Sequence, residues 1–234
     1  AGIIGATIAE QLQSRGHSAL LVDRDEPGTG CSFGNAGHFA TDVVLPLANM
    51  QTILSLPKLL TDPLGPLSIR WQYLPKLIPW MLRFAMAALP GNVRQSCTHL
   101  RALNGRSIES YDRLLGRLGL QDLMTKKGAL TVYESAASAG KNANTVAQLR
   151  GFGVEIESLG REQIRDLEPA LSEHIAGGLY FPKTAHTVNP YRLVKSLVAE
   201  FRSRGGQWLQ QAVSGLHTRA DGTTDIALRD GSRL

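Results

Sequence analysis

Two glycines and one acid near the start of the chain have the types and spacing that nucleotide binding needs. Gly2 and Gly5 open a predicted helix over residues 4–15, and Asp23 stands 18 residues after Gly5. Glycines let backbone N–H groups approach a pyrophosphate, and the positive end of the helix dipole stabilises its charge. An acid about 20 residues further on can accept hydrogen bonds from ribose hydroxyls. The chemistry indicated is the binding of a dinucleotide.

The elements that must position these residues follow in the expected order. Ile4, Ile8 and Leu12 predict one apolar face of the helix. Residues 18–23 form a short apolar run that is typical of a buried strand, and the acid ends it. The alternative is an ordinary β-α-β unit with an incidental carboxylate. The first glycine of the full fingerprint would precede Ala1.

The segment after this strand favours FAD over NAD. An NAD-type unit usually proceeds to another helix and strand, whereas residues 28–38 consist mainly of glycine and other small residues. Small residues let backbone amides and short side chains approach the second part of a large cofactor. An NAD-dependent dehydrogenase with the same opening fingerprint stays open as the alternative.

These residues resemble the flavin-binding N-terminus of the D-amino-acid dehydrogenase family, which is related to glycine oxidase, sarcosine oxidase and D-amino-acid oxidase. Asp23-Arg24 matches the acid–arginine pair after the family's second strand. Residues 32–37 match its Ser-x-x-Asn-Ala-Gly stretch, which lies against the flavin. The resemblance continues more loosely through residues 71–80 and 167–171, so it spans most of the chain.

The resemblance implies a set of FAD-binding residues, which are Gly2, Ile3, Ile4, Gly5, Asp23, Arg24, Ser32, Asn35, Ala36, Gly37 and Val213. It implies no obligatory side-chain base, because the neutral amine of the substrate can drive hydride loss. His38 departs from the family pattern, since several relatives have glutamine there. It is either a residue that faces the substrate or a loop histidine with a packing role.

The activity implied is the oxidation of a D-amino acid, such as a D-proline derivative, to its imine and then to a keto acid. The electrons would pass to a quinone-type acceptor. A non-catalytic subunit of a heteromeric dehydrogenase, which binds FAD only as part of its structure, is a further alternative.

The expected fold is α/β, with a discontinuous Rossmann-like FAD-binding domain and an inserted α+β substrate domain. The FAD-binding domain would use residues 1–48 and 186–234, and the substrate domain residues 49–185. Strands are expected over residues 128–133 and 154–159 of the inserted domain, and a helix over residues 137–152. Both ends of the chain look cut, so we expect an internal fragment of a longer bacterial protein.

Composition excludes several other classes of protein. The 234 residues are 43% hydrophobic and 19% charged, with no uninterrupted apolar run of membrane-spanning length. The net charge of +5 is spread along the chain, which argues against a nucleic-acid partner. Two cysteines favour a reducing, cytoplasmic compartment. No histidines or cysteines have metal-ligand spacing, so no metal is expected.

Residues 54–89 allow two interpretations. The stretch is rich in leucine and aromatic residues interleaved with Lys58, Arg70, Lys76 and Arg83. It can form the core of the substrate domain with its cations reaching solvent, or it can lie on an anionic membrane surface, on the inner face of the cytoplasmic membrane. Its many prolines predict that its helices are short and broken.

Overall fold

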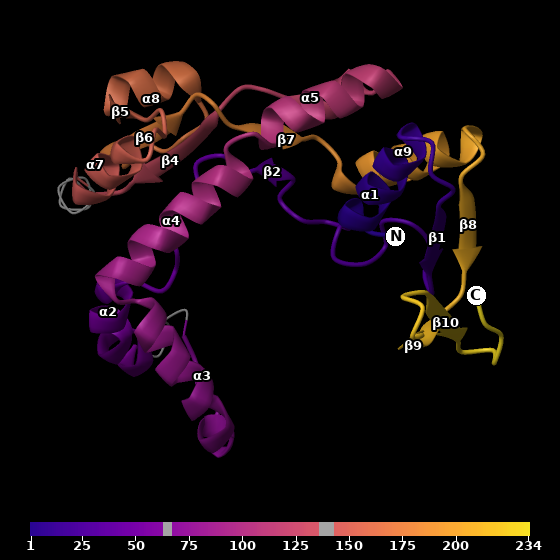
Figure 1. Ribbon diagram of the computed structural model, residues 1–234. Helices are drawn as coiled ribbons and strands as arrows, with labels where there is room; N and C mark the ends of the chain where they lie inside the picture. The colour runs from indigo at the N-terminus through magenta and orange to yellow at the C-terminus, as the bar shows by residue number, and fades with distance from the viewer. Residues whose placement is uncertain (63–66, 136–142) are drawn as a thin grey trace. The chain divides into compact units, whose positions relative to one another are not determined.

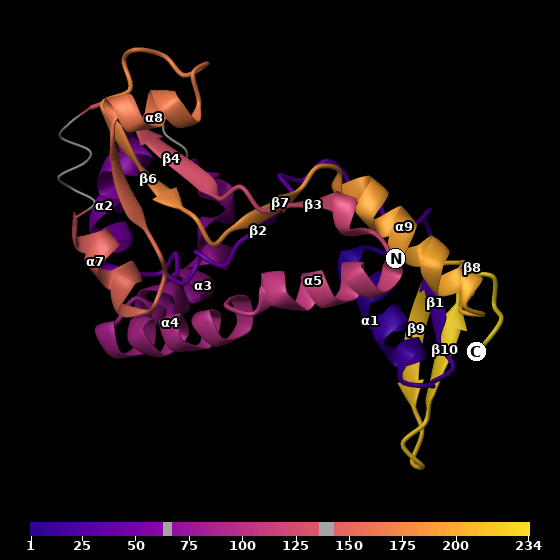
Figure 2. The ribbon, with the colours of Figure 1, turned by 90° about the horizontal axis from the view of Figure 1, so that it is seen from above.

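The computed structural model describes residues 1–62, 67–135 and 143–234, and they form two compact units, each a mixture of helices and strands (Figures 1 and 2). The first unit combines Ala1–Phe39, Tyr111–Lys126 and Ala185–Leu234. The second combines Ala40–Ser110 and Lys127–Thr184. The first and last parts of the chain therefore fold together. The predicted functional domains, with boundaries after residues 48 and 185, stay a prediction.

The first unit contains the elements at both ends of the sequence and the end of a central helix. They are α1 (Ile3–Ser14), β1 (Leu20–Asp23), β2 (His38–Phe39), α5 (Ser107–Leu118) from Tyr111 onward, η2 (Gln121–Leu123), β3 (Met124–Thr125), β7 (Ala185–Thr187), α9 (Pro190–Ser203), β8 (Gln207–Gln210), β9 (Val213–Thr218) and β10 (Thr224–Leu228).

Two helices and two strands form the centre of this unit. β1 pairs with β8 in parallel, from Leu20 opposite Gln207 to Asp23 opposite Gln210. Figures 1 and 2 show α1 beside α9 and β1 beside β8. Asn189 and Pro190 are residue types typical of the start of a helix, and α9 begins there. The Asn189 side chain accepts a hydrogen bond from the Arg192 N–H at 2.9 Å and caps the helix.

Helix α1 agrees with its predicted range, but it does not bury its most apolar face. Ile4 is 73% exposed and Ile8 is 54% exposed, whereas Ala6 and Ala9 are buried. The small alanine side chains let α1 pack closely against its neighbours. Glu10, which lies on the same buried face, is only 1% exposed.

Two small antiparallel sheets complete the first unit. β7 lies between β2 and β3, with His38 opposite His186 and Thr125 opposite His186. β9 and β10 form a hairpin, and after Gly231 the chain turns back so that Leu234 and Ile226 exchange backbone hydrogen bonds of 3.0 Å.

The second unit contains α2 (Met50–Thr61), η1 (Trp71–Tyr73), α3 (Leu74–Ala87), α4 (Pro90–Asn104), the first turn of α5, β4 (Ala129–Tyr133), α7 (Ala143–Gly151), β5 (Glu157–Gly160), α8 (Arg161–Leu167) and β6 (Gly177–Phe181). β6 is the central strand of an antiparallel sheet, with β4 and β5 on either side. Helix α7 packs Val146 and Leu149 against this sheet. The resulting core contains Val44, Val146, Leu149, Val154, Ile156, Leu179 and Phe181.

Two local predictions for the second unit need correction, and a third is only partly covered by the described residues. Pro57 and Pro79 lie inside α2 and α3, so these helices continue through prolines that were expected to break them. The strand expected over residues 154–159 begins only at Glu157, while Val154 and Ile156 enter the core from irregular backbone. Part of the helix expected from residue 137 lies outside the described residues, and α7 begins at Ala143.

Among the helices of the described residues, none combines the length and the apolar character needed to cross a membrane.

Candidate cofactor site

A cavity of about 850 Å³ lies within the first unit, where several of its chain segments meet. The N-terminus of α1 and the end of β1 form part of its wall. The loop after β1 and the segment after β8 form the rest. The lining residues are Ala1, Gly2, Ile3, Ile4, Gly5, Val22, Asp23, Arg24, Asp25, Glu26, Gly28, Thr29, Gly30, Cys31, Ser32, Asn35, Gln211, Ala212, Val213, Ser214 and Arg229.

The N-terminus of α1 opens on this cavity. Gly2 stands at the N-cap position, and an added Cβ there would lie 3.2 Å from the Ser32 hydroxyl oxygen. The Ile3 N–H donates to that Ser32 oxygen at 2.9 Å, so the loop supplies the cap that glycine lacks. The next amides of the first turn have no partner inside the helix, as at every helix N-terminus. They leave a positive dipole end beside the cavity.

Gly5 brings the helix close to the strand. A Cβ built there would lie 3.5 Å from the Cδ1 atom of Leu21 in β1. This close contact is the role expected of the third glycine of a dinucleotide fingerprint. Glycine at position 5 therefore lets α1 lie as close to β1 as a dinucleotide-binding unit requires.

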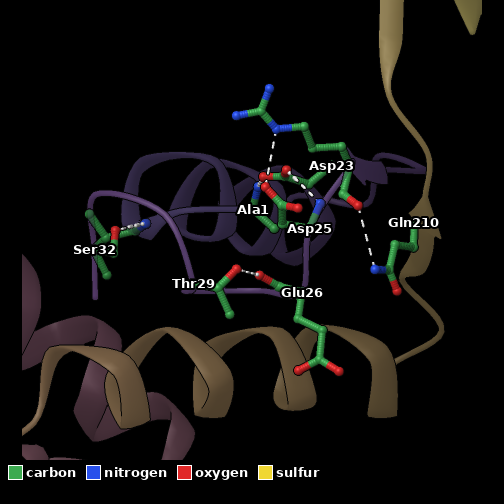
Figure 3. Close-up of polar contacts among 9 residues, drawn as sticks. Ala1, Asp23, Asp25, Glu26, Thr29, Ser32 and Gln210 are labelled. Carbon is green, nitrogen blue, oxygen red and sulfur yellow. Dashed lines mark hydrogen bonds and ion pairs between the residues drawn. The ribbon is translucent and has the colours of Figure 1, made fainter. Parts of the chain in front are cut away.

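Asp23 lies at the end of β1 and turns its carboxylate towards the N-terminal backbone. Figure 3 shows this carboxylate beside the Ala1 amino group, with which it forms an ion pair. Its Oδ1 atom accepts from the Asp25 N–H at 3.2 Å. A carboxylate in this position, at the end of a strand and beside the start of α1, can accept hydrogen bonds.

Hydrogen bonds within the loop after β1 give it a defined path around the cavity. The Gly28 N–H donates to the Ala1 carbonyl at 3.0 Å, and the Thr29 hydroxyl donates to the Glu26 carbonyl at 2.7 Å (Figure 3). Further along, the Asn35 Oδ1 atom accepts from the Gly37 N–H at 2.7 Å. The polar side chains of the loop thus shape its backbone.

Nine of the sequence-predicted cofactor residues line the cavity, namely Gly2, Ile3, Ile4, Gly5, Asp23, Arg24, Ser32, Asn35 and Val213. Ala36 and Gly37 are not part of its wall. Gly37 instead packs against β7, because an added Cβ would lie 2.6 Å from the Thr187 carbonyl oxygen. His38 is outside the wall as well, in β2 opposite His186.

Apart from Val213, sequence reasoning missed the residues that reach the cavity from the C-terminal part of the chain. Arg229 is the most informative of them, since its N–H donates to the Ala212 carbonyl at 2.8 Å and both residues line the cavity. The alternating residues 225–228 before it predict a strand that leads into a hairpin turn, and nothing in this pattern indicates a cavity wall. A basic residue there suits an anionic ligand.

The donor set and the shape of this cavity fit the adenosine diphosphate part of FAD. A helix N-terminus suits a pyrophosphate, Arg24 and Arg229 are among the lining residues, and a carboxylate at a strand end suits ribose hydroxyls. Among the described residues, no three His, Cys, Asp or Glu side chains gather closely enough to hold a metal ion.

Comparison with known proteins agrees with this geometry. Residues 1–233 match the family of FAD dependent oxidoreductases called DAO. A D-amino-acid oxidase of Bradyrhizobium diazoefficiens is 27% identical over 219 residues, which cover 92% of this chain and 52% of that protein. A D-amino acid dehydrogenase of the same organism is 32% identical over 195 residues, which cover 78% of this chain and 44% of that protein. The chain thus spans about half the length of the curated relatives it matches.

Solved structures show the same fold. The glycine oxidase of Geobacillus kaustophilus matches 98% of this chain and 50% of its own chain, with a TM-score of 0.62 and 18% identity. The glycine oxidase of Bacillus cereus matches the same shares with a TM-score of 0.61. The chain therefore has the mixed α/β fold of FAD-dependent oxidoreductase structures. The family match favours FAD over the NAD alternative, and this chain belongs to the FAD-dependent oxidoreductase family DAO.

Proposed function

We propose that the protein oxidises a D-amino acid, such as a D-proline derivative, in an FAD-dependent reaction. The observation that carries the proposal is the cavity that combines the α1 N-terminus, the Asp23 carboxylate and a loop of small residues. The names of the relatives, D-amino-acid oxidase and D-amino acid dehydrogenase, support the substrate class.

In this proposal each wall of the cavity has its own part in holding FAD. The backbone N–H groups of Ile4 and Gly5 face the pyrophosphate, and the arginines Arg24 and Arg229 balance its charge. The Asp23 carboxylate accepts hydrogen bonds from the ribose of the adenosine. Ser32, Asn35 and Val213 lie along the path towards the flavin, and contact of Ala36 and Gly37 with it stays a prediction.

FAD, when bound, would supply the acceptor of the two electrons. The substrate would give up a hydride from its α-carbon to that acceptor and a proton from its nitrogen to water, which leaves an imine. Water then hydrolyses the imine to a keto acid and ammonia, whereas a cyclic substrate would give a cyclic imine. The protein's part is to orient the C–H bond and to exclude water from it.

The proposal extends to a quinone-type electron acceptor and to a cytoplasmic protein that contacts the membrane peripherally. A quinone is lipid-soluble, so an enzyme that reduces it works at the bilayer surface. His38 stays a candidate for facing the substrate, and no side-chain base is assigned.

The test is anaerobic bleaching of the flavin absorbance of the purified full-length protein. D-Alanine or a D-proline derivative should bleach it, and the L-enantiomers should not. A soluble quinone should then restore the oxidised spectrum faster than air does.

Each other outcome contradicts a defined part of the proposal. Bleaching by L-enantiomers alone would refute the substrate class. Rapid peroxide formation with oxygen as the sole acceptor would refute the quinone. A protein that holds FAD but bleaches with no amino acid would be the non-catalytic subunit. A purified protein without flavin would refute the cavity as its site.

A further inference from the structure

Helices α2 and α3 and the short η1 helix between them carry apolar side chains with very little cover. None of the described residues in these three elements is buried, although most of them are hydrophobic. We call these elements the α2–α3 surface. The described residues of these three elements do not form a buried core, whereas Ala88, directly after α3, is buried.

The inner side chains of the two helices meet only in part. Ile53 and Leu56 of α2 and Leu77 of α3 help to line an open apolar cavity of about 960 Å³. Trp80 stacks on Phe84 one turn further along α3, with ring centroids 5.0 Å apart. These contacts hold the surface together without covering it.

The outer side chains are large and exposed. Leu54 is 76% exposed, Trp71 74%, Leu82 63% and Trp80 57%. Isolated exposed apolar residues are ordinary, but a contiguous group of this size is typical of an interaction surface. Two tryptophans in such a group suit the interface between hydrocarbon and water, where their rings are enriched.

The charges on the surface are almost all of one sign. Between residues 50 and 89 the cations are Lys58, Arg70, Lys76 and Arg83, and the sole acid is Asp62. Lys76 and Arg83 are seven residues apart and so lie on one face of α3, two turns from each other. This combination of an apolar face and a basic face is that of a helix lying on an anionic bilayer.

We propose that the α2–α3 surface binds the headgroup region of an anionic lipid bilayer. Helices of 12 and 14 residues are shorter than the roughly 20 residues that span a bilayer, so they would lie in its plane. A protein partner is less suited to the surface, because the cores of protein interfaces are depleted in lysine. The inference rests on the peripheral membrane contact proposed above, for which it names the surface and the class of lipid, and it does not depend on the oxidation of an amino acid.

Tryptophan fluorescence and vesicle sedimentation test the proposal on the full chain. The chain has three tryptophans, so the variant Trp208→Phe emits only from Trp71 and Trp80. Its emission should shift to the blue with vesicles of phosphatidylcholine mixed with anionic phosphatidylglycerol, but not with phosphatidylcholine alone. High salt should reverse the shift.

A matched pair of charge variants separates this surface from general charge. Lys76→Gln with Arg83→Gln should weaken vesicle binding roughly 25-fold, or roughly fivefold for each cation. Arg165→Gln with Arg202→Gln removes the same charge at exposed positions on α8 and α9, and binding should change less than about twofold. FAD affinity should stay unchanged in both double variants.

Four results would overturn the proposal. One is the absence of binding to anionic vesicles, and another is equal binding to both kinds of vesicle. The third is an equal loss in the two double variants. The fourth is a stable dimer whose Trp71 and Trp80 emission is already blue-shifted and does not respond to vesicles, since a second copy would then cover the surface. Failure of the amino-acid assay would leave all of these measurements intact.

Discussion

Asp23 is the residue whose substitution most directly tests the cofactor site. Asp23→Asn keeps the shape of the side chain but removes its charge, so we expect FAD binding to weaken by about 1.5–3 kcal/mol, the range for hydrogen bonds to charged groups. Flavin fluorescence titration measures the affinity. Asp25→Asn is the control, because it makes the same charge change two residues away on the same cavity wall. Equal losses in both variants would show a general charge effect and no specific ribose contact.

Gly37 makes a prediction about stability, because its backbone and its surroundings both require glycine. Its φ is +64°, and an added Cβ would lie 2.6 Å from the Thr187 carbonyl oxygen. Gly37→Ala should therefore destabilise the protein by at least about 2 kcal/mol, through the strained conformation and the clash together. Urea unfolding measures the loss.

Gly34 provides the matched comparison for this variant. Its φ is +67°, but no atom lies within 4 Å of the Cβ position. Gly34→Ala should lose only about 1 kcal/mol from the backbone conformation. If the two variants were equally stable, the contact between Gly37 and Thr187 would carry no energy.

At the scale of elements, a buried carboxylate joins three helices of the first unit. Glu10 of α1 is 1% exposed, and its Oε2 atom accepts from Arg117 of α5 at 2.6 Å. Arg204, at the end of α9, approaches the other oxygen at 3.8 Å. Glu10 lies on the face of α1 that carries Ala6 and Ala9, and not on the face of Ile4, Ile8 and Leu12 that the sequence predicted to be apolar.

The two sides of this ion pair should respond differently to substitution. Arg117→Met leaves a buried carboxylate without its nearest partner and should cost about 3 kcal/mol of unfolding free energy. Glu10→Gln should cost only about 1 kcal/mol, because the arginine side chain is 40% exposed and reaches water. Urea unfolding followed by circular dichroism measures both. The double variant Glu10→Gln, Arg117→Met should lose less than the sum of the two single losses, and additive losses would contradict a coupled pair.

Tyr111 should make the stability of the first unit fall at alkaline pH. Its ring packs on Phe39 with centroids 4.5 Å apart. Burial raises the pKa of Tyr111, and a hydrogen bond with Thr7 offsets part of that effect. The pKa of Tyr111 is higher in the folded than in the unfolded chain. The protonated hydroxyl therefore contributes a stability that is fully present below the unfolded pKa of about 10 and is lost as pH rises through the folded pKa.

Tyr111→Phe should therefore flatten the fall in stability above about pH 10, the ordinary tyrosine pKa. The measurement is the urea midpoint of both proteins from neutral pH to pH 11. If the urea midpoint fell equally in the unmodified protein and in the variant, groups other than Tyr111 would cause the loss of stability at alkaline pH.

The sequence predicts elements with local causes well and long-range contacts poorly. α9 was predictable because Asn189 and Pro190 form its start within the chain itself. The buried face of α1 was not, since small residues and Glu10 bury where the more apolar Ile4 and Ile8 do not. The contact of Ser32 with Ile3 and the ion pair of Glu10 with Arg117 join residues that no periodicity connects.

The same distinction applies to the candidate site. Gly2, Gly5 and Asp23 were predictable because one compact motif contains them all. Arg229 was not, because only the tertiary fold brings the end of β10 to the cavity that the N-terminal motif opens.

At the scale of the whole molecule, FAD should stabilise the first unit more than the second, because the cavity lies within the first unit. Trp208 is the tryptophan of the first unit, and Trp71 and Trp80 belong to the second. With FAD at 100 times its dissociation constant, the unit that binds it should gain about 2.7 kcal/mol. The Trp71→Phe, Trp80→Phe variant reports the first unit, and Trp208→Phe reports the second.

We expect FAD to raise the urea midpoint reported by Trp208 more than the one reported by Trp71 and Trp80. The two variants without FAD provide the baseline. Equal shifts would mean that both units unfold in one cooperative transition. A shift confined to Trp71 and Trp80 would contradict the assignment of the cavity to the cofactor.

The parallel pairing of β1 with β8 also has a consequence for synthesis on the ribosome. Leu20 and its partner Gln207 are separated by most of the chain, and translation at roughly 5–20 residues per second takes about ten to forty seconds to cover that interval. During this time β1 has emerged without its partner strand, while every strand of the β4–β6–β5 sheet has already left the ribosome. The nascent chain thus completes the β4–β6–β5 sheet before β1 pairs with β8, and the cofactor cavity forms after that sheet.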